Sequence, residues 1–319
     1  NINNGGTAFY ITGGNTPNIS SLVTTGNLAL NMATGSTLVG WDQPTGTLSL
    51  NALAGVLGTP AVTNTTINDL SGGTYRYFVI NKANVLVDRN TTLSGTGSQY
   101  FPRVNFVSSS IQVGSGFTVT GTGSNQIGIA QRNYTGSAGV GAIVLNNSGT
   151  INLSGASSTG IAGDFATITN AGTITTSGDK STGIFGANSS IISNTGTINV
   201  GTTGTGNSGV GIYSTGGVVN LNSGSVFNMG TPDAVAVYGV YSTVNNSTNL
   251  NIGNSNYGFI LKGGSLTNTA GTSASMGSDS VYMYSTEGTT VTNDGTLIMS
   301  GADNVGLYMA QDPTSGVGG

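Results

Sequence analysis

Short apolar segments recur along the chain from residue 145 onward, and one polar phrase separates them at nearly even intervals. A branched apolar residue is followed by Asn, then by Gly-Thr and another branched apolar residue, as in segments 145–151, 168–174, 192–198 and 291–297. The Gly of this phrase, or the Thr that replaces it, stands at positions 149, 172, 196, 224, 248, 271 and 295. A period of roughly 20 to 50 residues is typical of a solenoid, whose units bury their apolar residues only against neighbouring units.

Each period also holds three short apolar pieces, which predict three strands per rung, a rung being one turn of the solenoid of about 24 residues. Alternation along a strand turns one residue inward and the next outward, so the inner residues are expected to stack in three columns. The expected columns are Ile151, Ile174, Ile198, Val226, Leu250, Ser273 and Leu297; Ile161, Ile184, Ile212, Val240, Phe259, Val281 and Leu307; and Ile168, Ile192, Val219, Val244, Leu266 and Val291. The pattern therefore predicts an all-β fold, a parallel β-helix.

Asn recurs two residues before the marker position of the phrase, with Thr269 in its place in one period. Asn tolerates the backbone of a tight corner, and stacked side-chain amides can hydrogen-bond from one rung to the next. We expect a structural Asn ladder rather than a row of polar ligands. Its predicted members are Asn147, Asn170, Asn194, Asn222, Asn246 and Asn293.

The period is clear only in the second part of the chain, which predicts two regions. Residues 1–103 contain strand-like segments between Gly-rich turns but follow the period poorly, so we expect an irregular N-terminal β-helical or capping region there. Residues 104–319 are expected to form regular parallel β-helix repeats that continue beyond this fragment.

The composition excludes several kinds of chemistry. The chain has no Cys and no His, which rules out disulfides, thiolate metal ligands, and triads that need an imidazole base. Its net charge is −4, and residues 133–319 carry eight acidic side chains against Lys180 and Lys262, so nucleic acid is not an expected partner. The Asp residues are scattered through the rung, and we expect no two of them to align on adjacent rungs with a basic partner. The predictions are therefore no enzyme, no cofactor and no metal site.

Aromatic residues occupy most of the positions directly after the central inner residue, and strand alternation turns them outward. The predicted outward column is Ala162, Phe185, Tyr213, Tyr241, Ile260, Tyr282 and Tyr308. Stacked rings on a flat sheet can bind a sugar ring or a partner protein, because aromatic side chains give a large contact area at low entropic cost. Rings also stabilise a sheet by contacting one another, and this alternative stays open.

A second candidate is a cationic stretch, in which Arg76, Lys82, Arg89, Arg103 and Arg132 are opposed only by Asp88 between residues 76 and 132. The guanidinium groups of Arg76, Arg89 and Arg103 lie near several aromatic residues in the sequence and could bind carboxylates or acidic sugars. Ordinary solubilising charge is the alternative interpretation.

The repeated Asn-x-Gly-Thr-Ile phrase, the Gly/Asn/Thr/Ser bias, the missing Cys and the central Gly-Ile-Tyr element together resemble passenger domains of type V monomeric autotransporters. The chain looks most like the very large fusobacterial outer-membrane adhesins. The resemblance covers about residues 104–319 well and the first hundred residues only in composition. It implies a right-handed parallel β-helix, secreted through a membrane barrel that would lie C-terminal to this fragment and is absent from it.

The resulting expectation is a cell-surface adhesin segment: a monomeric, rigid stalk, held at the bacterial outer membrane in the full-length protein, that presents loops or a flat face. Its expected partner is a host glycan, a host receptor protein or another bacterial surface. Two alternatives stay open, a carbohydrate-active β-helix enzyme and a passive spacer without a binding site of its own.

Overall fold

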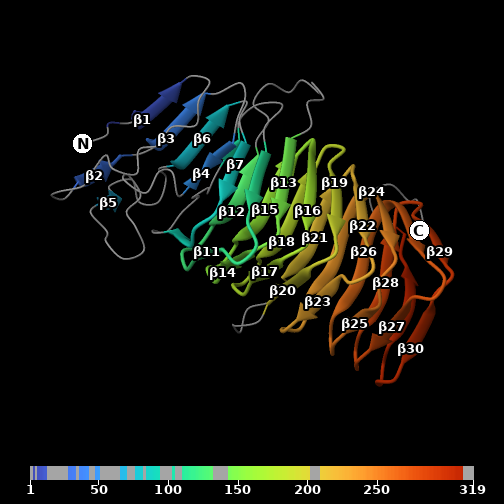
Figure 1. Ribbon diagram of the computed structural model, residues 1–319. Helices are drawn as coiled ribbons and strands as arrows, with labels where there is room; N and C mark the ends of the chain where they lie inside the picture. The colour runs from blue at the N-terminus through green and yellow to red at the C-terminus, as the bar shows by residue number, and fades with distance from the viewer. Residues whose placement is uncertain are drawn as a thin grey trace.

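The computed structural model is an all-β solenoid of about eight rungs with roughly 24 residues each. It describes residues 110–131, 143–201 and 209–311 continuously, and before them residues 3, 6–12, 28–33, 36–42, 47–50, 65–69, 76–81, 84–93 and 103–104. The strands stack in parallel from the N-terminal to the C-terminal end of an elongated body (Figure 1). The predicted parallel β-helix with three strands per rung is confirmed.

Each rung has three faces, which we number in the order in which the chain meets them. Face one holds β8 (Thr91–Leu93), β11 (Thr118–Gly121), β14 (Thr150–Leu153), β17 (Thr173–Thr176), β20 (Thr197–Val200), β23 (Val226–Met229), β25 (Leu250–Ile252), β27 (Ser273–Met276) and β30 (Thr296–Met299). Face two holds β12 (Ile127–Gln131), β15 (Thr159–Asp164), β18 (Thr182–Ala187), β21 (Val210–Thr215), β28 (Val281–Thr286) and β31 (Val305–Met309). Face three holds β10 (Ser110–Val113), β13 (Ile143–Asn147), β16 (Ala166–Asn170), β19 (Ile191–Asn194), β22 (Val218–Leu221) and β29 (Thr290–Asn293). The long strands β24 (Val235–Asn246) and β26 (Tyr257–Asn268) run through both face two and face three.

The described strands before residue 105 continue the same stacking. On face two, β1 (Thr7–Thr12), β3 (Thr37–Asp42), β6 (Arg76–Asn81) and β9 (Arg103–Val104) pair in parallel and lead into β12. On face three, β4 (Thr47–Ser49) and β7 (Asn84–Val87) lead into β10, while β2 (Leu28–Met32) and β5 (Thr65–Asp69) form a separate parallel pair. Strand pairing thus crosses residue 103 in the sheet of faces two and three.

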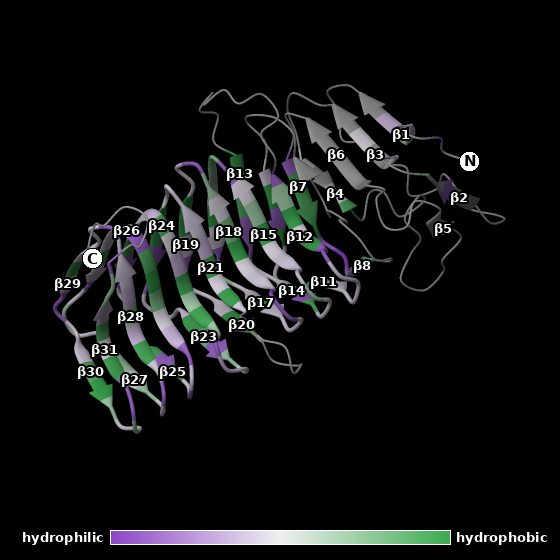
Figure 2. Ribbon diagram, turned by 180° about the vertical axis from the view of Figure 1, so that it is seen from behind, coloured by the Kyte–Doolittle hydropathy of each residue, from purple (hydrophilic) through white to green (hydrophobic). Residues whose placement is uncertain are grey.

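The core is a set of stacked aliphatic side chains inside the three faces, visible as apolar bands along the strands (Figure 2). On face three, the expected column from Ile168 to Val291 is confirmed in full by the strand register. A buried Ile or Leu contributes roughly 1.5–3 kcal/mol relative to an exposed one, so each added rung brings its own stabilisation. No helix of the described residues is long and apolar enough to cross a membrane.

The face-one column departs from the prediction at two rungs, where the corner has one extra residue. Phe227 instead of Val226 pairs with Ile198, and Ala274 instead of Ser273 pairs with Leu250. In both rungs the corner contains a β-turn with a glycine in the left-handed region, Gly224 at φ 98° and Gly271 at φ 84°. The extra residue moves the inward position to the third residue after the glycine instead of the second.

The face-two column is also displaced at two rungs. Val237, not Val240, lies between Ile212 and Phe259, and Met283, not Val281, lies between Phe259 and Leu307. The sequence of β24 contains two Val-Tyr pairs, and the second of them is at the corner between faces two and three. The outward residues at these rungs are therefore Tyr238 and Tyr284.

The Asn ladder lies at the corner between faces three and one, and side-chain amides join adjacent rungs. Asn147 Nδ2 donates to Asn170 Oδ1 at 2.8 Å, and Asn170 Nδ2 donates to Asn194 Oδ1 at 2.7 Å. After Asn194 the ladder is broken, because Leu221 and not Asn222 occupies the equivalent position. A second run then links Asn246, Asn268 and Asn293, so Asn268 holds the place expected for Thr269.

Candidate functional site

An outward column of aromatic side chains follows face two. The register places Ala130, Ala162, Phe185, Tyr213, Tyr238, Ile260, Tyr284 and Tyr308 in this order, one per rung. Ring centroids are 5.4 Å apart for Phe185 and Tyr213, 5.1 Å for Tyr213 and Tyr238, and 5.3 Å for Tyr284 and Tyr308. The column thus consists of two runs of mutually contacting rings with Ile260 between them.

Tyr241, a predicted member of this column, lies off it. Its position is equivalent to Phe165 and Asn188, at the corner between faces two and three, and its φ is 48°. The side chain is 63% exposed, and its hydroxyl donates to a carboxylate oxygen of Glu287. Glu287 also forms an ion pair with Lys262 at 2.9 Å. Tyr241 therefore belongs to a polar cluster at the corner, not to the aromatic column.

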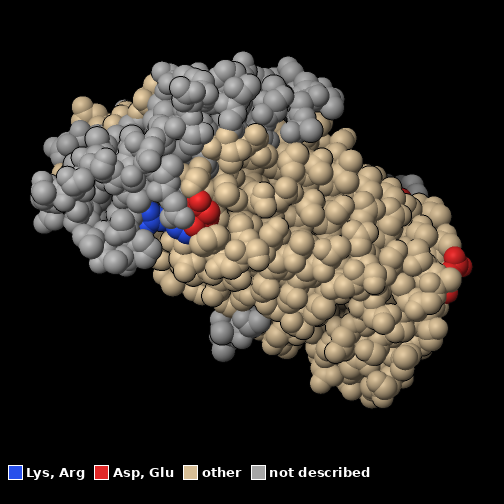
Figure 3. Space-filling model, in the orientation of Figure 1, with Lys and Arg blue, Asp and Glu red and all other residues tan. Residues whose placement is uncertain are grey.

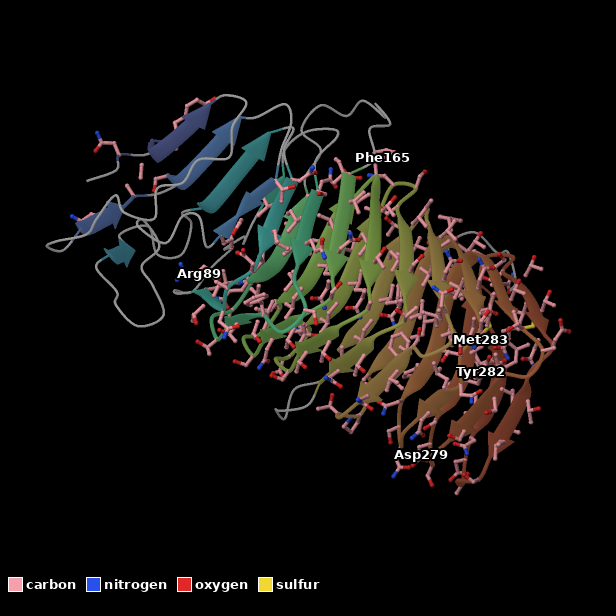
Figure 4. The ribbon with its side chains drawn as sticks, viewed as in Figure 1. Arg89, Phe165, Asp279, Tyr282 and Met283 are labelled. Atoms are coloured by element: carbon pink, nitrogen blue, oxygen red, sulfur yellow. The ribbon has the colours of Figure 1, made fainter. Side chains whose placement is uncertain are left out.

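Tyr282, a second predicted member, points into the solenoid. It is 3% exposed and lies next to the buried Met283 in β28 (Figure 4). Its ring and that of Phe259 form a T-shaped pair, with 5.4 Å between the ring centroids. Burial raises the pKa of the Tyr282 hydroxyl to about 12. Gly occupies most of the equivalent positions, including Gly160, Gly183 and Gly258. The usual Gly-Ile-Tyr pattern therefore does not predict an inward-facing Tyr at this position.

The outward column ends in a hollow at its N-terminal side. Two successive members of the column, Ala130 and Ala162, are small, so the side of Phe185 away from Tyr213 borders open space. The hollow has a volume of about 300 Å³. Its lining is mainly apolar and is made by Ile127, Ala130, Gln131, Thr159, Ala162, Gly163, Asp164, Phe185 and Ala187.

Two polar side chains stand at one end of this hollow. Gln131 Oε1 accepts a hydrogen bond from the backbone N–H of Asp164 at 2.6 Å, which fixes the orientation of the amide and leaves Nε2 as its other end. Gln131 is only 4% exposed, and its buried Nε2 has no hydrogen-bond acceptor among the residues that the structure describes. Asn188 Nδ2 donates to Asp164 Oδ1 at 2.7 Å. The hollow therefore has the carboxylate residue Asp164 beside an apolar wall, while the buried amide nitrogen of Gln131 is not accessible from it.

A second hollow, of about 480 Å³, lies over the corner between faces three and one. The two longer corners, around Gly224 and Gly271, project on either side of the shorter corner at Ser247 and Thr248. Hydroxyl and backbone groups dominate its lining. The extra residues that displaced the face-one column thus also form a surface depression.

The cationic candidate is only partly described. Arg76 begins β6 and Arg103 begins β9, but their side chains lie outside what the structure describes, as do Lys82 and Arg132. Arg89 is half-buried, and desolvation lowers the pKa of its guanidinium while the neighbouring Asp88 acts in the opposite direction. Among the described residues seen in Figure 3, few are charged, and most of their surface is tan.

The acidic residues are less scattered than expected at one corner. Asp279 and Asp303 occupy equivalent positions on adjacent rungs between faces one and two, and both have left-handed backbones, with φ of 56° and 54°. Asp tolerates this conformation, which the corner requires. Within the described ranges, no three His, Cys, Asp or Glu side chains gather where they could hold a metal ion.

The hollow beside Phe185 had a signal in the sequence, since Ala162 was already placed at the head of the outward column. A small residue in a column of large ones leaves space next to the first ring. The sequence could not place Gln131 and Asp164 together, because that depends on the rung-to-rung register at the end of β12. Comparison of the chain with protein-family models, curated proteins and solved structures finds no match.

Proposed function

We propose that this chain is a segment of a bacterial cell-surface adhesin, a rigid β-solenoid that acts by binding and not by catalysis. The observation that carries the proposal is the outward column on face two. Phe185, Tyr213 and Tyr238 lie on three successive rungs of this face, and Tyr284 and Tyr308 lie on two successive rungs beyond Ile260, so the rings form two runs on one face. Aromatic side chains in such a position are typical anchors of carbohydrate and protein partners.

The parallel solenoid supports this role through its mechanics. Each rung is hydrogen-bonded to the next along its faces, so the spacing of the rings is fixed by the backbone and not by flexible loops. Binding groups held on a rigid scaffold lose little conformational entropy when a partner binds. The proposed partner is a host glycan, a host receptor protein or the surface of another bacterium.

A passive spacer is the second candidate, and the ring contacts favour it. Adjacent aromatic side chains within 5.1 to 5.4 Å stabilise one another by about 0.5–1.5 kcal/mol per pair without any ligand. The column alone could therefore serve the fold. The two candidates differ in one respect, which is whether the rings also contact a partner.

A binding experiment separates them. The fragment 1–319 is tested against glycan arrays, receptor-protein panels and whole bacteria, and Tyr213→Ser and Tyr284→Ser variants are compared with it. Tyr241→Ser is the matched control, because this side chain is exposed but lies off the column. The adhesin proposal expects binding that each column variant weakens at least about tenfold and the control leaves unchanged. Absence of any binding partner, or equal loss in the control, would favour the spacer.

A further inference from the structure

Two columns of apolar residues lie next to each other on the outside of face two, from β21 to β31 (Figure 2), and both follow the strand register. The ring column here is Tyr213, Tyr238, Ile260, Tyr284 and Tyr308. The second column, nearer face one, is Val210, Val235, Tyr257, Val281 and Val305, and Val235 is its one buried member. Together the two columns form an apolar strip that is five rungs long.

The long strands β24 and β26 show that this strip is a property of the face. On face two their outward positions in the ring column hold Tyr238 and Ile260. After the corner the outward residues of the same strands are polar, namely Thr243, Asn245, Ser265 and Thr267. A contiguous apolar patch on an otherwise polar surface is typical of an interaction site. We therefore looked for the partner that fits the strip.

The orientations of the rings favour apolar side chains over a glycan. The ring planes of Phe185 and Tyr213 differ by 56°, and those of Tyr213 and Tyr238 differ by 87°. Rings oriented in this way do not form a flat platform on which successive sugar rings could stack. Tyr284 and Tyr308 are nearly parallel, at 12°, but they are stacked on each other and use their facing sides for that contact.

The geometry of the strip fits a second copy of the chain. The two columns are straight ridges with a groove between them, and they repeat at the rung spacing of about 4.8 Å. Two stacked sheets pack tightly when the ridge of one lies along the groove of the other, as in the dry interfaces between paired parallel sheets. A second copy offers a ridge and a groove of the same period, and a two-fold axis can place each ridge in the groove of the other copy.

Charge and size set the strength of such a pair. Among the described residues of face two from β21 to β31, the one charged side chain is Lys262, at the border with face three, and it is paired with Glu287. A neutral strip avoids the cost of desolvating charges. It measures roughly 19 Å along the solenoid and about 17 Å across, which is small for a protein interface, so the association should be weak.

We infer that face two binds face two of a second copy of this chain, with the ring column of each copy in the groove beside the ring column of the other. The inference rests on the proposed binding function and names the partner of the ring column. That partner is another molecule of the same adhesin, and the contact is made by apolar side chains.

The test measures the mass of the fragment 1–319 in solution by sedimentation equilibrium, at concentrations from about 1 to 200 µM. A monomeric stalk keeps a mass of 31.7 kDa at every concentration, whereas a pair raises the mass toward twice this value. Ile260→Lys places a charge within the ring column. Thr267→Lys is the matched control, because it places the same charge at an outward position of the same strand on face three. Tyr284→Ser and its control Tyr241→Ser, at an exposed corner position, form a second pair of variants.

The parent chain is expected to dimerise with a Kd of about 1–100 µM, as suits a small interface. Ile260→Lys should raise Kd at least about tenfold, because each dimer buries the new charge twice. Tyr284→Ser should raise it at least about fivefold, while both controls keep the parent value. If Ile260→Lys does not fold by circular dichroism, Tyr284→Ser carries the test.

Three outcomes overturn the inference. The first is a parent chain that stays monomeric up to about 200 µM. The second is a dimer that the face-two variants leave unchanged, which would place the contact elsewhere, for example at the exposed Ile298 and Met299 of the last rung. The third is a dimer that Thr267→Lys weakens as much as Ile260→Lys does.

The binding experiment on glycans, receptor proteins and bacteria separates this inference from the proposed function. If the chain stays monomeric but binds one of these partners through the ring column, the adhesin proposal stands without self-association. If it neither dimerises nor binds any of them, both fall together.

Discussion

A buried amide at this corner of the solenoid can bond side-chain amides at both of its ends only when both neighbouring rungs carry Asn. Asn170 meets this condition, because it accepts from Asn147 and donates to Asn194. Asn147 does not, since the preceding rung has Val113 at the equivalent position, and its Oδ1 has no donor. The ladder therefore stabilises its interior members more than its first one.

Replacing the central amide should be costly. Asn170→Ala leaves Asn194 Oδ1 without its donor and Asn147 Nδ2 with only the longer 3.3 Å bond to the Thr173 carbonyl, so we expect a loss of about 2–3 kcal/mol in unfolding free energy. Urea unfolding followed by circular dichroism measures it. Asn228→Ala is the control. The hydrogen bond of 2.7 Å from the Asn228 side-chain amide to that of Asn199 is exposed, so water can replace it. Equal losses in both variants would contradict a special role for the buried ladder.

The buried hydroxyl of Tyr282 predicts a pH-dependent difference. In the folded chain burial raises its pKa to about 12, whereas an unfolded tyrosine has a pKa of about 10. Between these values the unfolded state has already lost the proton that the folded state still holds. The contribution of this tyrosine to the unfolding free energy is therefore constant below about pH 10, and the unfolding free energy falls as the pH rises from about 10 toward 12.

Tyr282→Phe removes this effect and the unpartnered hydroxyl together while keeping the ring against Phe259. We expect the variant to be about 1 kcal/mol more stable at pH 8, since a buried hydroxyl without a partner is lost. The gain should grow by about 1.4 kcal/mol at pH 11. Unfolding curves at pH 8, 9, 10 and 11 measure the difference, to which the other tyrosines contribute equally in both proteins. A gain that is independent of pH would show that the hydroxyl ionises normally.

At the scale of the strand, one rung combines an unusually small inner residue, Ala274, with an unusually large one, Tyr282, at a position that is usually Gly. Ala274 is the smallest residue of the face-one column, where the preceding rungs carry Ile198, Phe227 and Leu250. Tyr282 is the largest residue at a position that is Gly in β15, β18 and β26, and both side chains belong to the same core. In the preceding rung a side chain at that position would press on its aliphatic neighbours, as a Cβ on Gly258 would lie 3.3 Å from Leu250 Cδ2 and 2.7 Å from Ile252 Cδ1.

If the large side chain of Tyr282 fills the space that the small Ala274 leaves, the effects of substituting the two residues should partly cancel. Tyr282→Gly should cost about 3–5 kcal/mol through the cavity it leaves, and Ala274→Leu alone about 1–3 kcal/mol through overpacking. The double variant restores the arrangement of the other rungs and should be more stable than Tyr282→Gly by at least about 1 kcal/mol. A double-mutant cycle of unfolding free energies measures this. Simple additivity would mean that the two side chains do not share one space.

How well the strands could be predicted depended on the length of the corners. Face three was predicted correctly at every rung because the branched residue that opens the phrase is itself the inner residue, from Ile168 to Val291, and the extra residues of the longer corners come after it. The prediction for face one was wrong at Phe227 and Ala274, because a β-turn adds one residue to the corner there while the sequence still resembles the repeated phrase. Such an insertion is visible only when the register of neighbouring strands is known.

Less of the candidate site than of the fold could be predicted from the sequence. Phe185, Tyr213 and Tyr308 were placed on the outward column by the alternation of β-strands, and their ring contacts agree with it. The predicted outward positions of Tyr241 and Tyr282 were wrong. A Val-Tyr pair has the same sequence whether it lies on a face, at a corner, or on a face with its inner residue shifted by one position. Alternation defines two sides of a strand, but only packing decides which side is the core.

For the whole molecule, the parallel stacking implies that stability is nearly a sum over rungs and the contacts between adjacent rungs. Asn170 and Asn194 are equivalent corner residues, and Ile151, Ile174 and Ile198 are equivalent inner residues. Removing the segment between two equivalent points should therefore let the two ends of the solenoid join in the same register. The joined rungs would again stack Ile on Ile on face one and keep the Gly-Thr corner intact.

We accordingly expect deletion of residues 171–194 to give a folded protein with the β-sheet circular dichroism of the parent. Its urea m-value should fall by roughly an eighth, because about one of eight rungs is gone and m follows the surface exposed on unfolding. Deletion of residues 171–182 is the control, since it removes half a rung, including the face-one strand β17, and shifts every later strand by one face. Cooperative unfolding of the first variant and failure of the second would establish that the rung, and not the strand, is the unit of this fold; equal behaviour of the two would contradict it.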